Sequence, residues 1–391
     1  MLRLLTAGES HGPCLTTILD GLPAGIPVDL VLLRAELARR RRGYGRGGRM
    51  AIEDDVAELV GGVRGGFTTG APVAITIPNR DFHVWQEVMA VGPEVDLESR
   101  RHTRPRPGHA DLAGSIKYGT TDSRNILERA SARETAARVA AGYVCKCLLA
   151  AAGIHPLGHV LTIGGESLTP AQHHTLAEPV RWDLARWQEI RSKVELSPVR
   201  CSFEEAERRM MKTIDDAASS GDTVGGRWEV RVMGVPPGLG NHSQWDRRLT
   251  SRLAAAVMSI QAHKAVEVGD GWGSGDLRGS QVHDEIVSVD GILSHLTNRA
   301  GGVEGGMTNG EDLIVRGVMK PLSTLRRPLR SVDLSTGEED LAGVERSDVC
   351  AVPAAVVVGE AMISLVLADA LLEKTGGDHL AEVLRALKRT P

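Results

Sequence analysis

Hydrophobic and polar positions along the chain repeat with helical spacing in long segments and with strand spacing in only a few short ones. Apolar residues on one face, or Ala-rich apolar runs, predict helices over residues 29–42, 131–152, 202–219, 246–266 and 347–374. Short β-branched or alternating runs predict strands over residues 73–77, 228–233 and 313–318. Strands and long helices do not alternate regularly, so the pattern favours an α+β fold over a doubly wound parallel sheet.

Several of the predicted helices carry recognisable end signals. Asp29 is placed to cap the first helix, and Gly43 follows where that helix would end. Ser131 and Glu134 have the spacing of a capping box ahead of the Ala-rich helix. Pro353 falls in the early turns of the last helix, where a missing N–H is tolerated.

A glycine-rich motif occurs twice. Residues 61–70 and 301–310 agree at seven of ten positions, and each copy precedes a predicted strand. Each is also followed, further on, by an arginine–serine opening to a long apolar helix. Recurrent Gly-rich turns would explain the likeness by chance. The alternative is two related halves packed about a pseudo-twofold axis, which would bring helix starts from both halves to one site.

Composition indicates how the core would be built. Hydrophobic residues are 42% of the 391, but aromatic residues are only 3% and glycines number 45. The core is therefore expected to be aliphatic and alanine-rich, with close approaches between backbones. No linker or low-complexity tract divides the chain, so we expect a single domain over residues 1–391.

Charge, cysteine content and apolar segments restrict the class of protein. The net charge of −4 argues against a nucleic-acid or membrane-surface binder. Five scattered cysteines suit reduced thiols in the cytoplasm. The longest apolar run, residues 349–372, contains Glu360 and Asp369 and predicts a buried helix rather than a membrane span. No signal-peptide pattern is evident at the amino terminus.

The stretch from Arg104 to Asp111 concentrates candidate chemistry. It holds two arginines, His109 and an aspartate on a backbone made rigid by two prolines. Such a segment can hold an anion and a proton donor in fixed geometry. A structural loop with arginine–aspartate pairs is the alternative. Near the amino terminus, residues 8–12 place Ser10 and His11 between glycines, either as a simple turn or as a site of proton transfer.

Residues 39–49 form an arginine- and glycine-rich run. Its G-x-G-x-x-G spacing is not a dinucleotide fingerprint, because a helix precedes it where the fingerprint needs a strand. RNA binding and a solvated charge run remain open. We favour a loop that closes over a polyanionic small molecule, since guanidinium groups bind phosphate and carboxylate bidentately.

Three further motifs supply cations. Arg129 and Arg133 flank the start of a helix, where free N–H groups favour anions, although a capping box alone would explain Ser131. Residues 320–324 offer Lys320 and two hydroxyls after a strand, and Asp348 lies close to a helix start, where capping is its alternative role. No metal-binding signature or P-loop is present. Together the motifs indicate a phosphate-bearing anionic substrate and proton chemistry, without naming the reaction.

Seven separated motifs together resemble chorismate synthases, in order and spacing: residues 8–12, 40–50, 106–111, 129–138, 301–310, 320–324 and 346–353. The resemblance implies a lyase that converts 5-enolpyruvylshikimate 3-phosphate to chorismate, in the shikimate pathway of aromatic amino-acid biosynthesis. The reaction is a trans-1,4 elimination of phosphate that needs reduced FMN without net redox change. A protein of the same fold that has lost turnover is the second hypothesis.

The resemblance also implies roles for individual residues. His11 would protonate the leaving phosphate, His109 would stabilise the reduced flavin, and Asp348 would assist proton removal through the flavin. The substrate-binding residues would be Ser10, Arg40, Arg46, Arg49, Arg106, Arg133 and Arg346. The FMN-binding residues would be Arg129, Ala130, Ser131, Gln261, Ala262, Gly305, Lys320, Pro321, Leu322, Ser323, Thr324 and Arg346.

The family link to NADP falls on Arg40 and Arg46, which we expect to contact substrate instead, because no dinucleotide fold is visible. NADPH is then an indirect electron source only. The resemblance further implies a β-α-β sandwich, with long central helices between two antiparallel sheets, in a cytoplasmic homotetramer. We expect Arg104 and Asp111 to be mainly structural partners.

Overall fold

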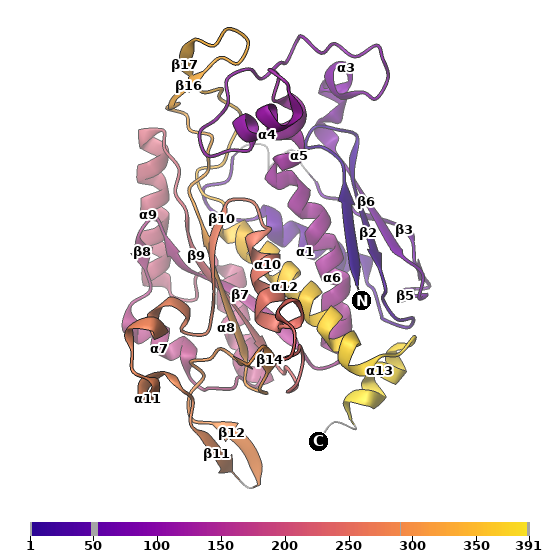
Figure 1. The fold of residues 1–391 in the computed structure, drawn as a ribbon, viewed down its shortest axis with the longest axis vertical. Helices are drawn as coiled ribbons and strands as arrows, with labels where there is room; N and C mark the ends of the chain where they lie inside the picture. The colour runs from indigo at the N-terminus through magenta and orange to yellow at the C-terminus, as the bar shows by residue number, and fades with distance from the viewer. Residues whose placement is uncertain (1, 48–53, 290, 389–391) are drawn as a thin grey trace.

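The structure, a computed structural model, describes residues 2–47, 54–289 and 291–388, and its largest elements are two antiparallel sheets (Figure 1). The four-stranded sheet has the order β1 (Arg3–Ala7), β2 (Cys14–Asp20), β6 (Val73–Pro78), β3 (Glu58–Gly61). The five-stranded sheet has the order β10 (His263–Val268), β15 (Leu313–Met319), β9 (Gly226–Met233), β7 (His155–Ile163), β8 (Glu166–Ser167). The predicted α+β class with antiparallel sheets is thereby confirmed.

Two-stranded ribbons and helices complete the described part of the chain. The ribbons are β4 (Val63–Arg64) with β5 (Phe67–Thr68), β11 (Ile286–Val289) with β12 (Ile292–His295), β13 (Val303–Glu304) with β14 (Met307–Thr308), and β16 (Arg330–Val332) with β17 (Glu339–Leu341). The α-helices are α1 (Leu30–Arg41), α3 (Gln86–Met89), α4 (Asp111–Tyr118), α5 (Arg124–Ala130), α6 (Thr135–Ala151), α7 (Pro170–Ala177), α8 (Leu184–Leu196), α9 (Glu204–Ser220), α10 (Leu249–Met258), α11 (Gly279–Val282), α12 (Val352–Thr375) and α13 (Leu380–Leu387). Short 3₁₀ turns are η1 (Arg80–Val84), η2 (Ala132–Glu134), η3 (Trp245–Arg247) and η4 (Gly271–Asp276).

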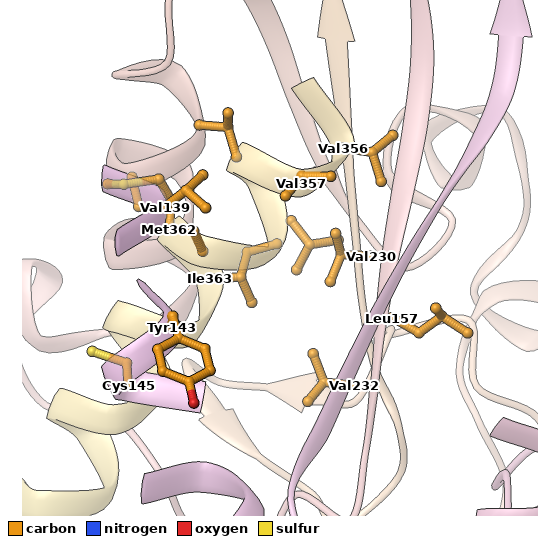
Figure 2. Close-up of a cluster of buried hydrophobic side chains, with 14 of the residues drawn as sticks. Val139, Tyr143, Cys145, Leu157, Val230, Val232, Val356, Val357, Met362 and Ile363 are labelled. Atoms are coloured by element: carbon orange, nitrogen blue, oxygen red, sulfur yellow. The ribbon is translucent and has the colours of Figure 1, made fainter. Parts of the chain in front are cut away.

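Two long helices lie between the sheets. Helix α6 packs on β2 and β6, α12 packs on β7 and β9, and the two helices pack on each other. Figure 2 shows the seam, where Val356 and Ile363 of α12 meet Val230 of β9. Gly142 allows the close helix contact, because a Cβ there would lie 2.3 Å from the Cβ of Ala361. The expected core of small and aliphatic residues is thus observed.

The repeated glycine motif forms two similar hairpins, β4–β5 and β13–β14. In both copies a threonine on the second strand of the hairpin binds an earlier loop through its hydroxyl. Thr68 Oγ1 donates to the Pro23 carbonyl (2.7 Å), and Thr308 Oγ1 donates to the Pro236 carbonyl (2.6 Å). The turn glycines also agree, with φ of 59° at Gly65 and 57° at Gly305 in the corresponding place. The local repeat is therefore structural, whereas a pseudo-twofold axis relating two halves of the chain stays a prediction.

Some helix predictions were wrong at their ends. The helix predicted over residues 246–266 ends at Met258, because Ala262 takes a left-handed φ of 64° and strand β10 begins at His263. Polar and apolar residues alternate toward the end of β10, which is typical of a strand. The predicted helix wrongly extended into this strand. The last helix begins at Val352 rather than residue 347, with Pro353 in its first turn.

Helix α12 is long and apolar enough to cross a membrane by length and composition alone. However, 89% of its most apolar window is buried inside the protein, which agrees with the predicted core helix.

Candidate active site

Loops from both sheets and the starts of both long helices supply the predicted site residues. The loop between β1 and β2 carries His11, and the strand end of β6 leads to Asn79. Asn79 Nδ2 donates to the carbonyls of Glu9 (3.1 Å) and Gly12 (2.7 Å), which fixes the His11 loop against β6. The long helices contribute η2 and α6 on one side and the segment before α12 on the other.

His11 is held by a carboxylate and an aromatic ring. Its Nδ1 lies 2.8 Å and 3.0 Å from the two carboxylate oxygens of Glu128, and its backbone N–H donates to the same carboxylate (2.8 Å). The imidazole stacks on Trp85 with 3.9 Å between ring centroids. Burial alone would raise the pKa of Glu128, but its hydrogen bonds from His11 and the charge of Arg124 lower that pKa below the usual value.

His109 is held by a carboxylate two residues further along the chain. Its Nδ1 contacts Asp111 Oδ1 at a short distance, and Asp111 is fully buried at the start of α4. Arg106 donates from Nε to Asp111 Oδ2 (2.8 Å) and from Nη1 to Thr324 Oγ1 (2.9 Å). Burial would raise the pKa of Asp111, but hydrogen bonds from His109 and Arg106 hold it well below the usual value.

Two of the predicted substrate arginines share one buried carboxylate. Arg40 donates from Nη2 to Asp55 Oδ2 (2.7 Å), and Arg133 pairs with the other oxygen of Asp55 at a short distance. Although burial opposes the charged form, the two guanidinium groups lower the pKa of Asp55 to about 2. Arg133 also donates from Nε to Asn79 Oδ1 (2.9 Å), which joins this cluster to the His11 loop.

The segment before α12 places the third predicted catalytic residue. Asp348 pairs with Arg46 Nη1 (2.7 Å) and accepts from the Gly47 N–H (2.6 Å). Burial lowers the pKa of the Arg40 guanidinium most, and the nearby charges of Arg133 and then Arg46 lower it further. The side chain of Arg346 is 59% exposed and pairs with Asp81 (3.0 Å). The predicted substrate residue Arg49 lies outside the described residues.

The loop after β15 approaches the His109 loop. Lys320 Nζ donates to Ser323 Oγ (2.8 Å), and a Cβ at Gly108 would lie 3.5 Å and 3.4 Å from these two atoms. Gly108 has φ of +78°, so the backbone here takes a conformation that glycine favours. Burial and the charge of Lys264 lower the pKa of Lys320. Through Thr324 the same loop is bonded to Arg106. Pro321 and Leu322 belong to this loop.

The predicted flavin residues around α5 and η2 are bonded to neighbouring elements. Arg129 donates to the carbonyls of Gly8 (3.0 Å) and Thr6 (2.9 Å), so its guanidinium ties α5 to the end of β1. Ser131, which follows Ala130, caps η2 by accepting from the Arg133 N–H and donates to Ser10 Oγ (3.1 Å). The capping box expected there is incomplete.

Glu134 makes other contacts in place of the expected cap. Its carboxylate accepts from Arg138 (2.8 Å) and from Gln261 Nε2 (3.0 Å). Gln261 Oε1 is buried and has no hydrogen-bond partner among the described residues. Ala262 accepts from the Lys320 N–H (3.0 Å), so Gln261 and Ala262 lie beside the Lys320 loop.

Gly305 is not brought to this group. It lies in the turn of the β13–β14 hairpin, ahead of β15, whereas Lys320 follows the far end of that strand. The seven residues of β15 span about 23 Å at a strand rise of about 3.3 Å per residue.

Sequence reasoning missed the groups that hold the histidines and arginines. Glu128, Asp55, Asn79 and Trp85 are buried and contact predicted site residues directly. Only Glu128 carried a local signal, its i,i+4 spacing from Arg124, with which it forms an ion pair (3.3 Å). The other three contacts join segments far apart in the sequence.

Clustered arginines and carboxylate-bonded histidines are typical of an enzyme that acts on an anionic small molecule. The sequence profile described as chorismate synthase matches residues 2–372. A chorismate synthase of Desulforamulus reducens is 53% identical over 390 residues, covering 100% of this chain and 98% of its own. One of Acidothermus cellulolyticus is 54% identical, covering 99% and 98%. The chain belongs to the chorismate synthase family.

A solved structure agrees with this membership. It is titled "Crystal Structure of Chorismate Synthase", is 41% identical, and superposes with a TM-score of 0.78 over 99% of this chain and 96% of its own. The chain is therefore a lyase of the shikimate pathway, which forms chorismate from 5-enolpyruvylshikimate 3-phosphate.

The family requires a reduced flavin, and the described residues fit one. Lys320 and Ser323 supply a cation and a hydroxyl for a phosphate group, with Gly108 leaving open the space a side chain would fill. The unpaired Gln261 Oε1 beside them offers an acceptor for a ring N–H.

Proposed function

We propose that the trans-1,4 elimination of phosphate takes place among His11, His109 and Asp348. One observation carries the proposal: both histidines have Nδ1 on a buried carboxylate, and each carboxylate also binds a buried arginine, Arg124 at Glu128 and Arg106 at Asp111. An ionised carboxylate only accepts hydrogen bonds, so Nδ1 of His11 keeps its proton and its Nε2 is left for the reactants. At His109 the carboxylate favours the same form, although Arg106 Nη2 also lies 3.0 Å from Nδ1.

The arginines provide for the substrate's anions. The substrate carries one phosphate and two carboxylates, and Arg40, Arg46 and Arg133 lie close together near Asp348. Their present partners, Asp55 and Asp348, hold the guanidinium groups in place before the substrate binds. Arg106, Arg346 and Ser10 would complete the anion site, with Arg346 the most exposed of the three.

His11 would donate the proton that the departing phosphate needs, from Nε2 to a phosphate oxygen as the carbon–oxygen bond breaks. Lys320, Ser323 and Thr324 would hold the flavin phosphate and its neighbours, with Gln261, Ala262 and Ser131 on the adjoining side. In this position reduced FMN would supply electron density for the elimination, without net redox change. His109 would hold a proton at Nε2 beside that loop, and Asp348 would accept one.

Several wider features rest on the family likeness. We infer a cytoplasmic homotetramer with a single domain per chain, and a pseudo-twofold relation between two halves of the fold. Within a single chain, Gly305 is not part of the proposed site. NADPH would act only as an indirect source of electrons, because a separate dinucleotide-binding fold is not evident in the described residues.

Anaerobic assay with reduced FMN and 5-enolpyruvylshikimate 3-phosphate tests the proposal. The chain should release chorismate and phosphate in equal amounts. His11→Asn and His109→Asn should each lower kcat by about 10²–10⁴, the usual contribution of acid–base groups. A protein that binds FMN and substrate but forms no chorismate would support the alternative of a fold that has lost turnover. Full activity in both variants would remove the assigned roles.

A further inference from the structure

Glu128 is a buried acid to which none of the sequence motifs assigns a function. It lies on α5, its side chain is fully buried, and its partner His11 is 117 residues away in the sequence. Burying a carboxylate is costly unless its oxygens are bonded. Here Oε1 and Oε2 receive the His11 Nδ1 and backbone N–H, while Arg124 adds a weaker contact at 3.3 Å.

The bonds define which nitrogen of His11 carries hydrogen. The pKa of Glu128 is lowered despite burial, chiefly by its hydrogen bonds from His11, so the group is a carboxylate near neutral pH. A carboxylate cannot donate, and both of its oxygens lie within 3.0 Å of Nδ1. Nδ1 must therefore be the donor. Nε2 makes no hydrogen bond to any residue that the structure describes.

The ring is also fixed in orientation. Trp85 stacks on His11 at an interplanar angle of 21°. The guanidinium of Arg100 lies 4.0 Å from the Trp85 ring centroid and that of Arg124 lies 5.3 Å away. Rotation of the imidazole would break the Glu128 bond and the stack together, so Nε2 has one direction available.

We propose that Glu128 is a positioning residue for His11, which fixes the Nδ1–H form of the imidazole and directs Nε2 toward the leaving phosphate. The inference rests on the proposed role of His11 as proton donor. In each turnover the Nε2 proton passes to a phosphate oxygen as the carbon–oxygen bond breaks with its electron pair on that oxygen. The ring is left neutral with hydrogen on Nδ1, and Nε2 takes the next proton from solvent.

The first test is Glu128→Gln, measured for chorismate formation with reduced FMN. A glutamine is neutral and places an NH2 donor where one of the two carboxylate oxygens now faces Nδ1, so neither charge nor bonding pattern holds the Nδ1–H form of His11 as the carboxylate does. We expect kcat to fall by about 10²–10⁴, the larger figure being the loss when the carboxylate that orients the histidine of a serine-protease triad is replaced, while KM changes less than about threefold. Glu345→Gln is the matched control, because Glu345 binds Arg124 (3.1 Å) without touching His11. It should leave kcat within about twofold.

A double-mutant cycle separates positioning from a merely structural role. If Glu128 acts through His11, Glu128→Gln should cost almost nothing further in a His11→Asn background. An equal loss in both backgrounds would overturn the inference while leaving the role of His11 intact. Wild-type turnover in His11→Asn alone would instead remove the proposed function of His11, so the two failures are distinguishable.

Nitrogen NMR of the wild-type protein gives a readout that does not depend on any variant folding. With labelled histidine, the neutral His11 ring should carry hydrogen at Nδ1. Glu128→Asp, which keeps the charge on a shorter side chain, should retain this form and recover part of the activity lost in Glu128→Gln. Hydrogen at Nε2 in the neutral wild-type ring would contradict the proposal.

Discussion

The positions of His11 and His109 can be compared directly, because each ring presents Nδ1 to a fully buried carboxylate. For His109 the carboxylate is local, since Asp111 lies two residues away and also binds Arg106. For His11 it comes from a distant helix. The same electrostatic arrangement can thus be built within one loop or between remote segments. Only the local version is visible in a sequence.

The two sites also differ in enclosure. The His11 side chain is 10% exposed and stacked on Trp85, whereas that of His109 is 21% exposed and follows Gly108, which lies beside Lys320 and Ser323. A shielded imidazole suits proton delivery away from water, and a more open one suits contact with a bound cofactor. The difference supports separate roles for the two histidines.

The largest effect that would break the comparison is expected at Asp111→Asn. Arg106 would lose the carboxylate that receives its Nε and one Nη, and a buried charge without its partner destabilises a protein by about 3–5 kcal/mol. Glu128→Gln should cost less stability, because Arg124 keeps Glu345. Urea unfolding of the two variants measures the difference.

Asp340→Asn is the control for this measurement. It removes the exposed ion pair between Asp340 and Arg104, a residue of the same 104–111 stretch as Asp111. The urea midpoint of unfolding should not change. Equal stability losses in Asp111→Asn and Glu128→Gln would show that the local and the distant carboxylate are equivalent.

Lowering the pH should reduce the free energy of unfolding through these buried carboxylates. The pKa values of Asp111, Asp55 and Glu128 are all lowered in the folded protein, so their stabilisation is present above the unfolded pKa near 4 and lost as pH falls. For Asp55, with a folded pKa of about 2, the loss is on the order of 2 kcal/mol. Unfolding free energies measured from about pH 5 to 2 should decline.

The slope of that decline distinguishes the carboxylates. Asp111→Asn should flatten it more than Glu128→Gln, because the pKa of Asp111 lies further below its ordinary value. A wild-type stability that does not change with pH over this range would argue against ionised, bonded carboxylates at these positions.

The smallest effect is expected at Thr324→Val. The substitution keeps the shape of the side chain but removes the acceptor for Arg106 Nη1, at a cost of about 1 kcal/mol in unfolding free energy. Because Thr324 belongs to the proposed phosphate loop, the Kd for FMN should rise a few-fold, while the NMR signals of His11 stay unchanged. A shift at His11 as large as that at His109 would mean that the two sites are not independent.

Much of this arrangement could be predicted from local patterns. Asp29 does cap α1 through the N–H of Val31, and the strands around residues 73–77 and 313–318 are present. The arginines, histidines and Lys320 were recognised because their motifs are contiguous. Asp55 and Asn79 were not, because each acts on a distant residue and carries no pattern of its own. Glu128 was not, because its one local signal, the i,i+4 spacing from Arg124, does not point to His11, which is 117 positions away.

The paired hairpins have a consequence for how the site is positioned. Strand β6 follows one hairpin and ends at Pro78, directly before Asn79, and β15 follows the other and ends at Met319, directly before Lys320. Each strand therefore transmits the register set by its own glycine turn to one wall of the site. A slip of one residue in either strand would displace that wall by about 3.3 Å and reverse its side chains. A substitution in the loops beyond these strands can therefore change one side chain of the site, whereas a change in the turns before them would shift a whole strand.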